Sequence, residues 1–343
     1  MHETRQATIL QRSAALLLAI LLALSLSMQQ GWATQGGARQ LIPMGRAVGI
    51  KLFADGVLVV ATSDLNGNER SPAGDCGLKE GDLILRINDE TIQSTEHLQS
   101  VLQETGDAPV TLTVRRGSRT TQLETGAVLC DDGVYRLGAW IRDSMAGIGT
   151  LTFYDPETGS YGALGHGITD VDTHVLMPLS AGSIMETTVR AVKKGQCGQP
   201  GELKGDFSQQ RDVGTVSANT SAGIFGTVSD DAFAGAGEPI PVAQSSEVHL
   251  GEATILCTVS GDSTESYRVE IIRLSPHKQD MRNLLLRVTD QRLLDTTGGI
   301  VQGMSGSPII QDGKFVGAVT HVLVNDPTQG YGILMENMLK MAG

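Results

Sequence analysis

Aromatic residues are scarce in this chain of 343 residues, which has only 6 Phe, 5 Tyr and 2 Trp. Glycine is abundant instead: there are 42, well above the roughly 7% of average proteins. Because each glycine in a helix interior costs about 1 kcal/mol, this composition disfavours helical bundles and coiled coils. No Gly-X-Y repeat is present, which excludes collagen. A chain of this length and composition predicts a mainly β protein with tight turns and room for two domains.

Clusters of positive charge are also missing. The chain has 26 basic and 38 acidic residues, a formal net charge of −12. A nucleic-acid groove needs a basic stripe to neutralise phosphates, so we expect no nucleic-acid partner. The four cysteines lie far apart and lack the spacing of a zinc site, so we expect no metal and no cofactor. The sequence leaves their disulfide pairing open; they are Cys76, Cys130, Cys197 and Cys257.

Only one long apolar run is present. Residues 14–28 carry no charge, and Arg5 and Arg12 precede them, which is the layout of a secretory signal. The run is shorter than the ~17–25 residues of a membrane span, although it can be extended to residues 9–28. We therefore predict export across a membrane, with residues 1–33 acting as a signal peptide or a membrane anchor.

A first β-rich segment covers residues 47–117. It contains a GL–x–x–GD–x–I–x–x–I–N run at 77–88, followed by a helix whose N-cap is predicted at Ser94. This segment resembles a PDZ domain, an α+β fold that binds a peptide as an added strand at a sheet edge. The resemblance implies that Gly49 and Ile50 form the loop that holds a peptide C-terminus. The alternative is a small spacer domain without a ligand.

The remainder of the chain is mainly β as well. We place linkers at residues 34–46 and 118–137, and a second domain over residues 138–343. Its strand-forming segments alternate with glycine-rich turns, and only the last residues have a helical pattern.

The strongest chemical signal is the segment Gly303-Met304-Ser305-Gly306-Ser307-Pro308. A serine hydroxyl needs an adjacent base to become a nucleophile, and a tight turn that exposes it. Glycines on both sides permit such a turn, and the N–H groups of Gly303 and Ser305 are then the predicted oxyanion donors. The pattern resembles the nucleophile segment of chymotrypsin-like serine peptidases. The alternative is a glycine-rich β-turn without chemistry.

The candidate general base is His166, which follows an apolar strand between Gly165 and Gly167. A general base needs an imidazole that can approach the serine while its second nitrogen is held by a partner. His321 lies 16 residues beyond Ser305 and is the rival candidate. We favour His166 because it precedes the serine, as the base does in chymotrypsin-like enzymes.

The carboxylate of a catalytic triad is harder to assign. Spacing alone favours Asp290 only modestly over the other aspartates. It ends a predicted strand, where a carboxylate can be held rigidly toward an imidazole. Asp170 and Asp172 can equally be turn-forming residues after the histidine strand. The candidates between the histidine and the serine are Asp170, Asp172, Asp290 and Asp295.

Longer strings around these residues point to one family. Residues 138–170, 297–309 and 320–332 resemble the stage IV sporulation protein B peptidases of endospore-forming bacteria. The resemblance implies a membrane segment, a PDZ domain and a chymotrypsin-like double β-barrel, in that order. It matches the catalytic serine, histidine and aspartate of the family to Ser305, His166 and Asp290. That aspartate lies unusually close to the serine, since in chymotrypsin-like enzymes it belongs to the first barrel with the histidine.

The family resemblance also implies a biological role. It implies a serine endopeptidase exported across the forespore membrane into the intermembrane space. Its expected substrates are itself and a membrane-bound regulator of an intramembrane protease, whose loss permits processing of a late mother-cell sigma factor. Peptide C-termini are the expected ligands of the PDZ domain. The alternative is a non-catalytic exported scaffold that docks a membrane signalling complex, and a PDZ domain that gates the peptidase is a further hypothesis.

Overall fold

The computed structural model describes residues 39–65, 71–229, 233, 235–277 and 281–342. The predicted signal or anchor, residues 1–33, lies outside the described residues. Within the described ranges, no helix has the length and apolar character needed to cross a bilayer.

The fold is mainly β, as predicted, and begins with a barrel of six antiparallel strands. Each strand pairs with the next in the order β1, β8, β9, β12, β11 and β10, and β10 pairs back with β1, which closes the ring. These strands are β1 (Gln40–Thr62), β8 (Ala139–Tyr154), β9 (Ser160–Ala163), β10 (Ala181–Lys193), β11 (Glu202–Thr220) and β12 (Gly223–Val228).

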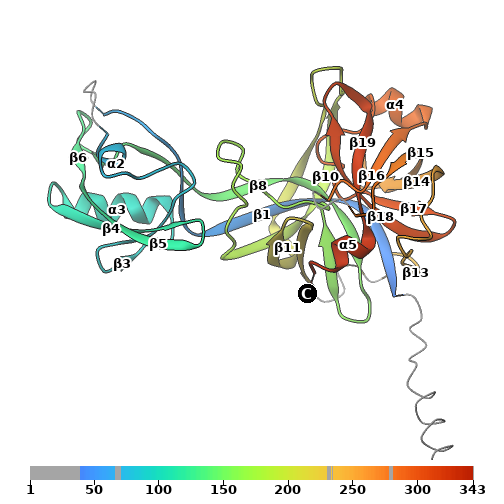
Figure 1. Cartoon of the computed structure of the whole chain (residues 1–343), viewed down its shortest axis with the longest axis horizontal. Coiled ribbons are helices and arrows are strands. Elements are labelled where there is room, and N and C mark those ends of the chain that lie inside the picture. The colour runs from blue at the N-terminus through green and yellow to red at the C-terminus, as the bar shows by residue number, and fades with distance from the viewer. Residues whose placement is uncertain (1–38, 66–70, 230–232, 234, 278–280, 343) are drawn as a thin grey trace, which may run out of the picture. The chain divides into compact units, whose positions relative to one another are not determined.

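A second closed barrel follows in the last third of the chain, drawn in orange and red in Figure 1. Its ring order is β14, β15, β16, β19, β18 and β17. The strands are β14 (Gly251–Cys257), β15 (Glu265–Leu274), β16 (Leu284–Val288), β17 (Pro308–Gln311), β18 (Lys314–Leu323) and β19 (Asp326–Leu334). The short strand β13 (Ile240–Pro241) pairs with the start of β1, and the helices here are α4 (Gln291–Thr297) and α5 (Met335–Leu339). The two rings confirm the predicted double β-barrel.

The segment predicted as a PDZ domain is built between the first two strands of the first barrel. The end of β1 pairs with β2, and β2 pairs with β4, so this sheet continues from the barrel strand. Its elements are α2 (Pro72–Asp75), β2 (Leu83–Ile87), β3 (Glu90–Thr91), α3 (Thr95–Thr105), β4 (Pro109–Arg116), β5 (Arg119–Gly126), β6 (Val128–Leu129) and β7 (Tyr135–Arg136). Helix α3 buries Leu98 and Leu102 against this sheet. Its N-cap is Ser94, as predicted, because the Ser94 side chain accepts a hydrogen bond from the His97 N–H at 3.0 Å.

The structure corrects the predicted start of this segment. Gly49 and Ile50 lie in the middle of β1, with β8 on one side and β10 on the other. Gly49 pairs with Ile148 and Met185, and the Ile50 side chain is buried in the barrel core. Their place inside a paired strand therefore rules out the predicted carboxylate-binding loop at these residues. Residues 40–46, predicted as a linker, are part of the same barrel strand.

Candidate active site

The serine turn, residues 302–307, lies between α4 and β17. Two glycines shape it. Gly303 has a φ of +97° and Gly306 a φ of +99°, a region that residues with a Cβ rarely adopt. A Cβ on Gly306 would lie 2.1 Å from the carbonyl oxygen of Thr150, a residue of β8. The turn therefore packs tightly against the first barrel, and Gly306 is required at this point.

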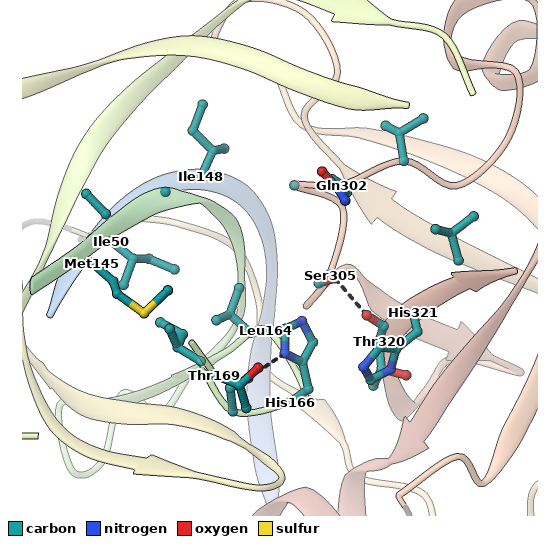
Figure 2. A pocket seen from close by; sticks show the side chains of 17 residues that line it. Ile50, Met145, Ile148, Leu164, His166, Thr169, Gln302, Ser305, Thr320 and His321 are labelled. Carbon is teal, nitrogen blue, oxygen red and sulfur yellow. Dashed lines mark hydrogen bonds between the residues drawn. The ribbon is translucent and has the colours of Figure 1, made fainter. Parts of the chain in front are cut away.

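The Ser305 hydroxyl faces β18. It donates a hydrogen bond to the Thr320 carbonyl oxygen at 2.7 Å (Figure 2). This bond holds the side chain at the edge of the second barrel, in a half-buried position. The hydroxyl must leave the Thr320 carbonyl before its proton can pass to a base.

His166 follows β9 in a turn of the first barrel. Leu164 and Gly165 have φ values of +71° and +68°, which reverse the chain just before the imidazole. The Nδ1 atom lies 2.8 Å from the Gly167 carbonyl oxygen, which can only accept, so Nδ1 carries the proton of the neutral ring. Nε2 then has a free lone pair. Burial lowers the pKa of His166, partly opposed by the Gly167 hydrogen bond, so the neutral form of the ring is favoured.

Ser305 and His166 line the same cavity, which has a volume of about 420 Å³. The first barrel contributes β8 and the histidine turn to its lining, and the second contributes the serine turn and β18 (Figure 2). His321 also lines this cavity, and its ring centroid lies 4.9 Å from that of His166. The lining contains these two histidines and one serine but no carboxylate among the residues that the structure describes.

Backbone donors of the serine turn divide into two groups. The N–H groups of Met304, Gly306 and Ser307 donate to backbone carbonyls. Within the described part of the chain, the N–H groups of Gly303 and Ser305 have no protein acceptor. These are the two donors that the sequence pattern predicts for an oxyanion, and the turn leaves both available to a ligand oxygen.

Asp290 does not join this cavity, and the structure corrects its predicted role. It is the N-cap of α4, where its carboxylate accepts from the Arg292 N–H at 3.0 Å and pairs with the Arg292 guanidinium at 2.9 Å. The Arg268 N–H is a further donor at 3.3 Å. Hydrogen bonds from Arg292 lower the pKa of Asp290 to about 2. These contacts assign the carboxylate to the start of a helix, and none of them involves the imidazole.

The other carboxylates near the histidine organise its turn. Asp170 is fully buried and accepts from the N–H groups of Asp172 and Thr173, as a turn former does. Its second oxygen is paired with Arg142 of β8. Burial raises the pKa of Asp170, but the bonds from Thr173 and Arg142 outweigh it and the net shift is downward. Sequence reasoning missed Arg142, because nothing in the local pattern links it to a residue 28 positions later.

A second cavity, of about 370 Å³, lies between α3 and the start of β8. Leu98 and Leu102 of α3 form one wall, and Gly138, Trp140 and Ile141 form the other. On this stretch β8 pairs with β1 along one edge, and its pairing with β9 begins only at Leu151. Among the residues that the structure describes, no strand pairs with the second edge of β8 here, so an added strand could bind next to α3. This groove replaces Gly49 and Ile50 as the candidate peptide site.

Neither a metal cluster nor a disulfide is present among the described residues. No group of three or more His, Cys, Asp or Glu side chains in that part of the chain is arranged to hold a metal ion. All four cysteines are free thiols.

A double β-barrel that brings a serine from one barrel and a histidine from the other into one cavity defines a chymotrypsin-like serine peptidase. Residues 133–339 match the family model of the SpoIVB peptidase S55, and residues 65–116 match that of a PDZ domain. The chain therefore belongs to the SpoIVB peptidase S55 family, and it contains a PDZ domain.

Other similarities are partial. The probable protease eep of Enterococcus faecalis is 34% identical over 67 residues, which are 18% of this chain and 16% of that protein. The chain thus matches about a sixth of the length of that curated relative. The Rv3671c protease of M. tuberculosis, in its active form, has a TM-score of 0.34 at 15% identity, over 57% of this chain and 72% of that one. The PDZ domain of the SdrC-like protein from Listeria monocytogenes has a TM-score of 0.22 at 21% identity, over 25% of this chain and 87% of that one.

Proposed function

We propose that this chain is an exported serine endopeptidase of sporulation, which cleaves itself and a membrane-bound regulator of an intramembrane protease. Removal of that regulator then permits processing of a late mother-cell sigma factor. The observation that carries the catalytic part is the shared cavity: it is lined by His166, Ser305 and Gly303, and the N–H groups of the last two have no protein acceptor among the described residues. The family match supports the biological part.

The proposed chemistry begins at Ser305. Its hydroxyl leaves the Thr320 carbonyl and donates to Nε2 of His166, which takes the proton as the oxygen attacks the peptide carbonyl. The carbonyl oxygen becomes negative and accepts from the N–H groups of Gly303 and Ser305. The imidazolium then returns its proton to the leaving amine, which departs and leaves Ser305 acylated. Water attacks the acyl-enzyme in the same way, with His166 again taking the proton, and Ser305 is released. The Gly167 carbonyl holds Nδ1–H and fixes the tautomer throughout.

The partners and the compartment follow the same proposal. The uncharged run at residues 14–28 supports export into the space between the forespore membranes, with residues 9–28 as an anchor before release. The groove between α3 and β8 supports binding of a substrate or regulator C-terminus as an added strand. Its apolar walls favour a peptide with apolar side chains at alternate positions.

The test compares Ser305→Ala with Ser266→Ala, which alters an exposed serine of β15 that does not line the cavity. A fluorophosphonate should label the wild type and Ser266→Ala at Ser305 and leave Ser305→Ala unlabelled, with equal urea midpoints for all three. N-terminal sequencing should show processed protein in all but Ser305→Ala. In the bacterium that encodes this chain, Ser305→Ala should abolish heat-resistant spores and cleavage of the regulator.

Two results would reject this proposal. Normal processing in purified Ser305→Ala would show that another group cuts the chain. A wild-type protein that fluorophosphonate does not label would support the non-catalytic scaffold instead.

A further inference from the structure

Several carbonyl groups of the serine turn accept hydrogen bonds, including those of the two residues whose N–H groups have no protein acceptor among the described residues. The Gln302 carbonyl accepts from the Leu203 N–H at 2.8 Å, and the Met304 carbonyl accepts from the Ser307 hydroxyl at 2.7 Å. Because a trans peptide directs its C=O and N–H to opposite sides, fixing the Gln302 carbonyl also fixes the direction of the Gly303 N–H. Two further carbonyls of the turn, those of Gly303 and Ser305, are bound from the other barrel.

Both of these bonds come from Thr150 of β8. The Thr150 hydroxyl donates to the Gly303 carbonyl at 2.7 Å, and the Thr150 N–H donates to the Ser305 carbonyl at 3.0 Å. Thr150 is 1% exposed, so neither bond competes with bulk water. One residue of the first barrel thus holds the same two residues whose N–H groups have no protein acceptor in the described part of the chain.

The hydroxyl bond acts at Gly303, a residue whose backbone has little intrinsic restraint because it has no Cβ. Its φ of +97° lies in a region open to glycine, and a glycine peptide flips more easily than any other. A flip of the peptides around Gly303 would turn an oxyanion donor away from the reacting oxygen. The Gly303–Met304 peptide is restrained by the bond from Thr150 and by the bond from the Met304 N–H to the Val301 carbonyl. The Gln302–Gly303 peptide, which carries the donor, is restrained by the bond from Leu203.

We propose that Thr150 is a positioning residue for the oxyanion hole, and that its hydroxyl, by holding the Gly303–Met304 peptide, keeps the backbone at Gly303 in the orientation that serves catalysis. This inference rests on the proposed role of Ser305. It adds a residue that contacts neither the substrate nor the reacting atoms, and that acts from the opposite barrel through Gly303.

The strand supplies its own matched control. Thr152 lies two residues along β8 and is fully buried, and its hydroxyl has no hydrogen-bond partner among the described residues. Thr150→Val and Thr152→Val therefore make the same chemical change on the same strand, and only the first removes a hydrogen bond to the serine turn. Thr150→Ser keeps the hydroxyl, and Thr150→Ala removes it without placing a methyl group beside the Gly303 carbonyl.

The experiment measures fluorophosphonate labelling of Ser305 against probe concentration in the full chain. In Thr150→Val and Thr150→Ala the limiting rate should fall about 10- to 100-fold, while the concentration for half-maximal rate stays within about threefold. Thr150→Ser and Thr152→Val should keep the limiting rate of the wild type. The urea unfolding midpoints of all variants show whether a lower labelling rate is accompanied by a loss of folding stability.

The outcomes distinguish this inference from the proposed function. A wild type that is never labelled would reject both. A labelled wild type with unchanged limiting rates in Thr150→Val and Thr150→Ala would reject the role of Thr150 alone. Equal losses in Thr150→Ser and Thr150→Ala would also overturn it, because the hydroxyl would then not be the group that matters. If Thr150→Val does not fold, Thr150→Ala decides the question.

Discussion

Replacing Asp290 by Asn separates a helix cap from a catalytic carboxylate. In a catalytic triad, this change turns the imidazole to the wrong tautomer and lowers kcat by about 10⁴. At the N-cap of α4, Asn keeps an oxygen for the Arg292 N–H and loses only the charge that faces the Arg292 guanidinium. We therefore expect Asp290→Asn to retain the rate of Ser305 labelling and to have a lower free energy of unfolding.

The magnitude follows from the contacts of the carboxylate. A pKa of about 2, in place of 3.8 for a free aspartate, corresponds to about 2 kcal/mol of stability at neutral pH. Because the Arg292 side chain is 61% exposed, solvent screening reduces this value. We therefore expect Asp290→Asn to lower the free energy of unfolding by about 1–2 kcal/mol, and Asp290→Ala to lower it further through loss of the cap.

The assay has two parts and one control. Urea unfolding at pH 7 should show the loss in Asp290→Asn, whereas Asp206→Asn, which removes an exposed ion pair with Arg190, should change little. The limiting rate of Ser305 labelling should stay within about threefold of the wild type.

The pH dependence fixes the sign of the effect. The folded pKa of Asp290 is depressed, so its contribution is complete above the unfolded pKa near 3.8 and disappears as the pH falls toward 2. The difference in stability between the wild type and Asp290→Asn should therefore vanish over that interval. A fall of about 10⁴ in rate with unchanged stability would refute the cap and restore Asp290 to the triad.

Two further predictions concern the two cavities. Since burial lowers the pKa of His166, the acidic limb of the pH profile of Ser305 labelling should have its midpoint below 6.5, and a midpoint above 6.5 would contradict the buried neutral base. In the groove beside α3, Trp140→Ala should weaken binding of a labelled peptide with an apolar C-terminus by about tenfold in fluorescence anisotropy. Leu250→Ala, which removes an exposed apolar side chain outside the groove, should not weaken it.

Local sequence was sufficient to predict a structural feature wherever one short stretch of chain contains all the residues that form it. The glycines around Ser305 predicted a tight turn with two available donors, because the conformations that such a turn needs are accessible mainly to glycine. The Ser94 cap and the helix after it were predicted from adjacent residues in the same way. The mainly β class followed from composition.

The same local reasoning failed where two explanations share one pattern. An aspartate at the end of a strand was interpreted as a rigid triad member, although Asp290 also begins a helix that its side chain caps. A glycine before an apolar run was interpreted as a peptide-binding loop at Gly49, although the strands on both sides of it belong to a barrel. At Gly49 the deciding partners, β8 and β10, are distant in the sequence, whereas the N–H that Asp290 caps belongs to Arg292, only two residues further on.

The sequence by itself therefore determined the class of protein and the residues of the nucleophile turn. The class followed because low aromatic and high glycine content are typical of a β-rich fold. Only the tertiary structure decided what surrounds the nucleophile turn. It placed the histidine of one barrel beside the serine of the other, and it revealed the bonds from Thr150 to Gly303 and Ser305. Hydrogen bonds between residues about 150 positions apart depend on strand register and barrel closure, which no local pattern specifies.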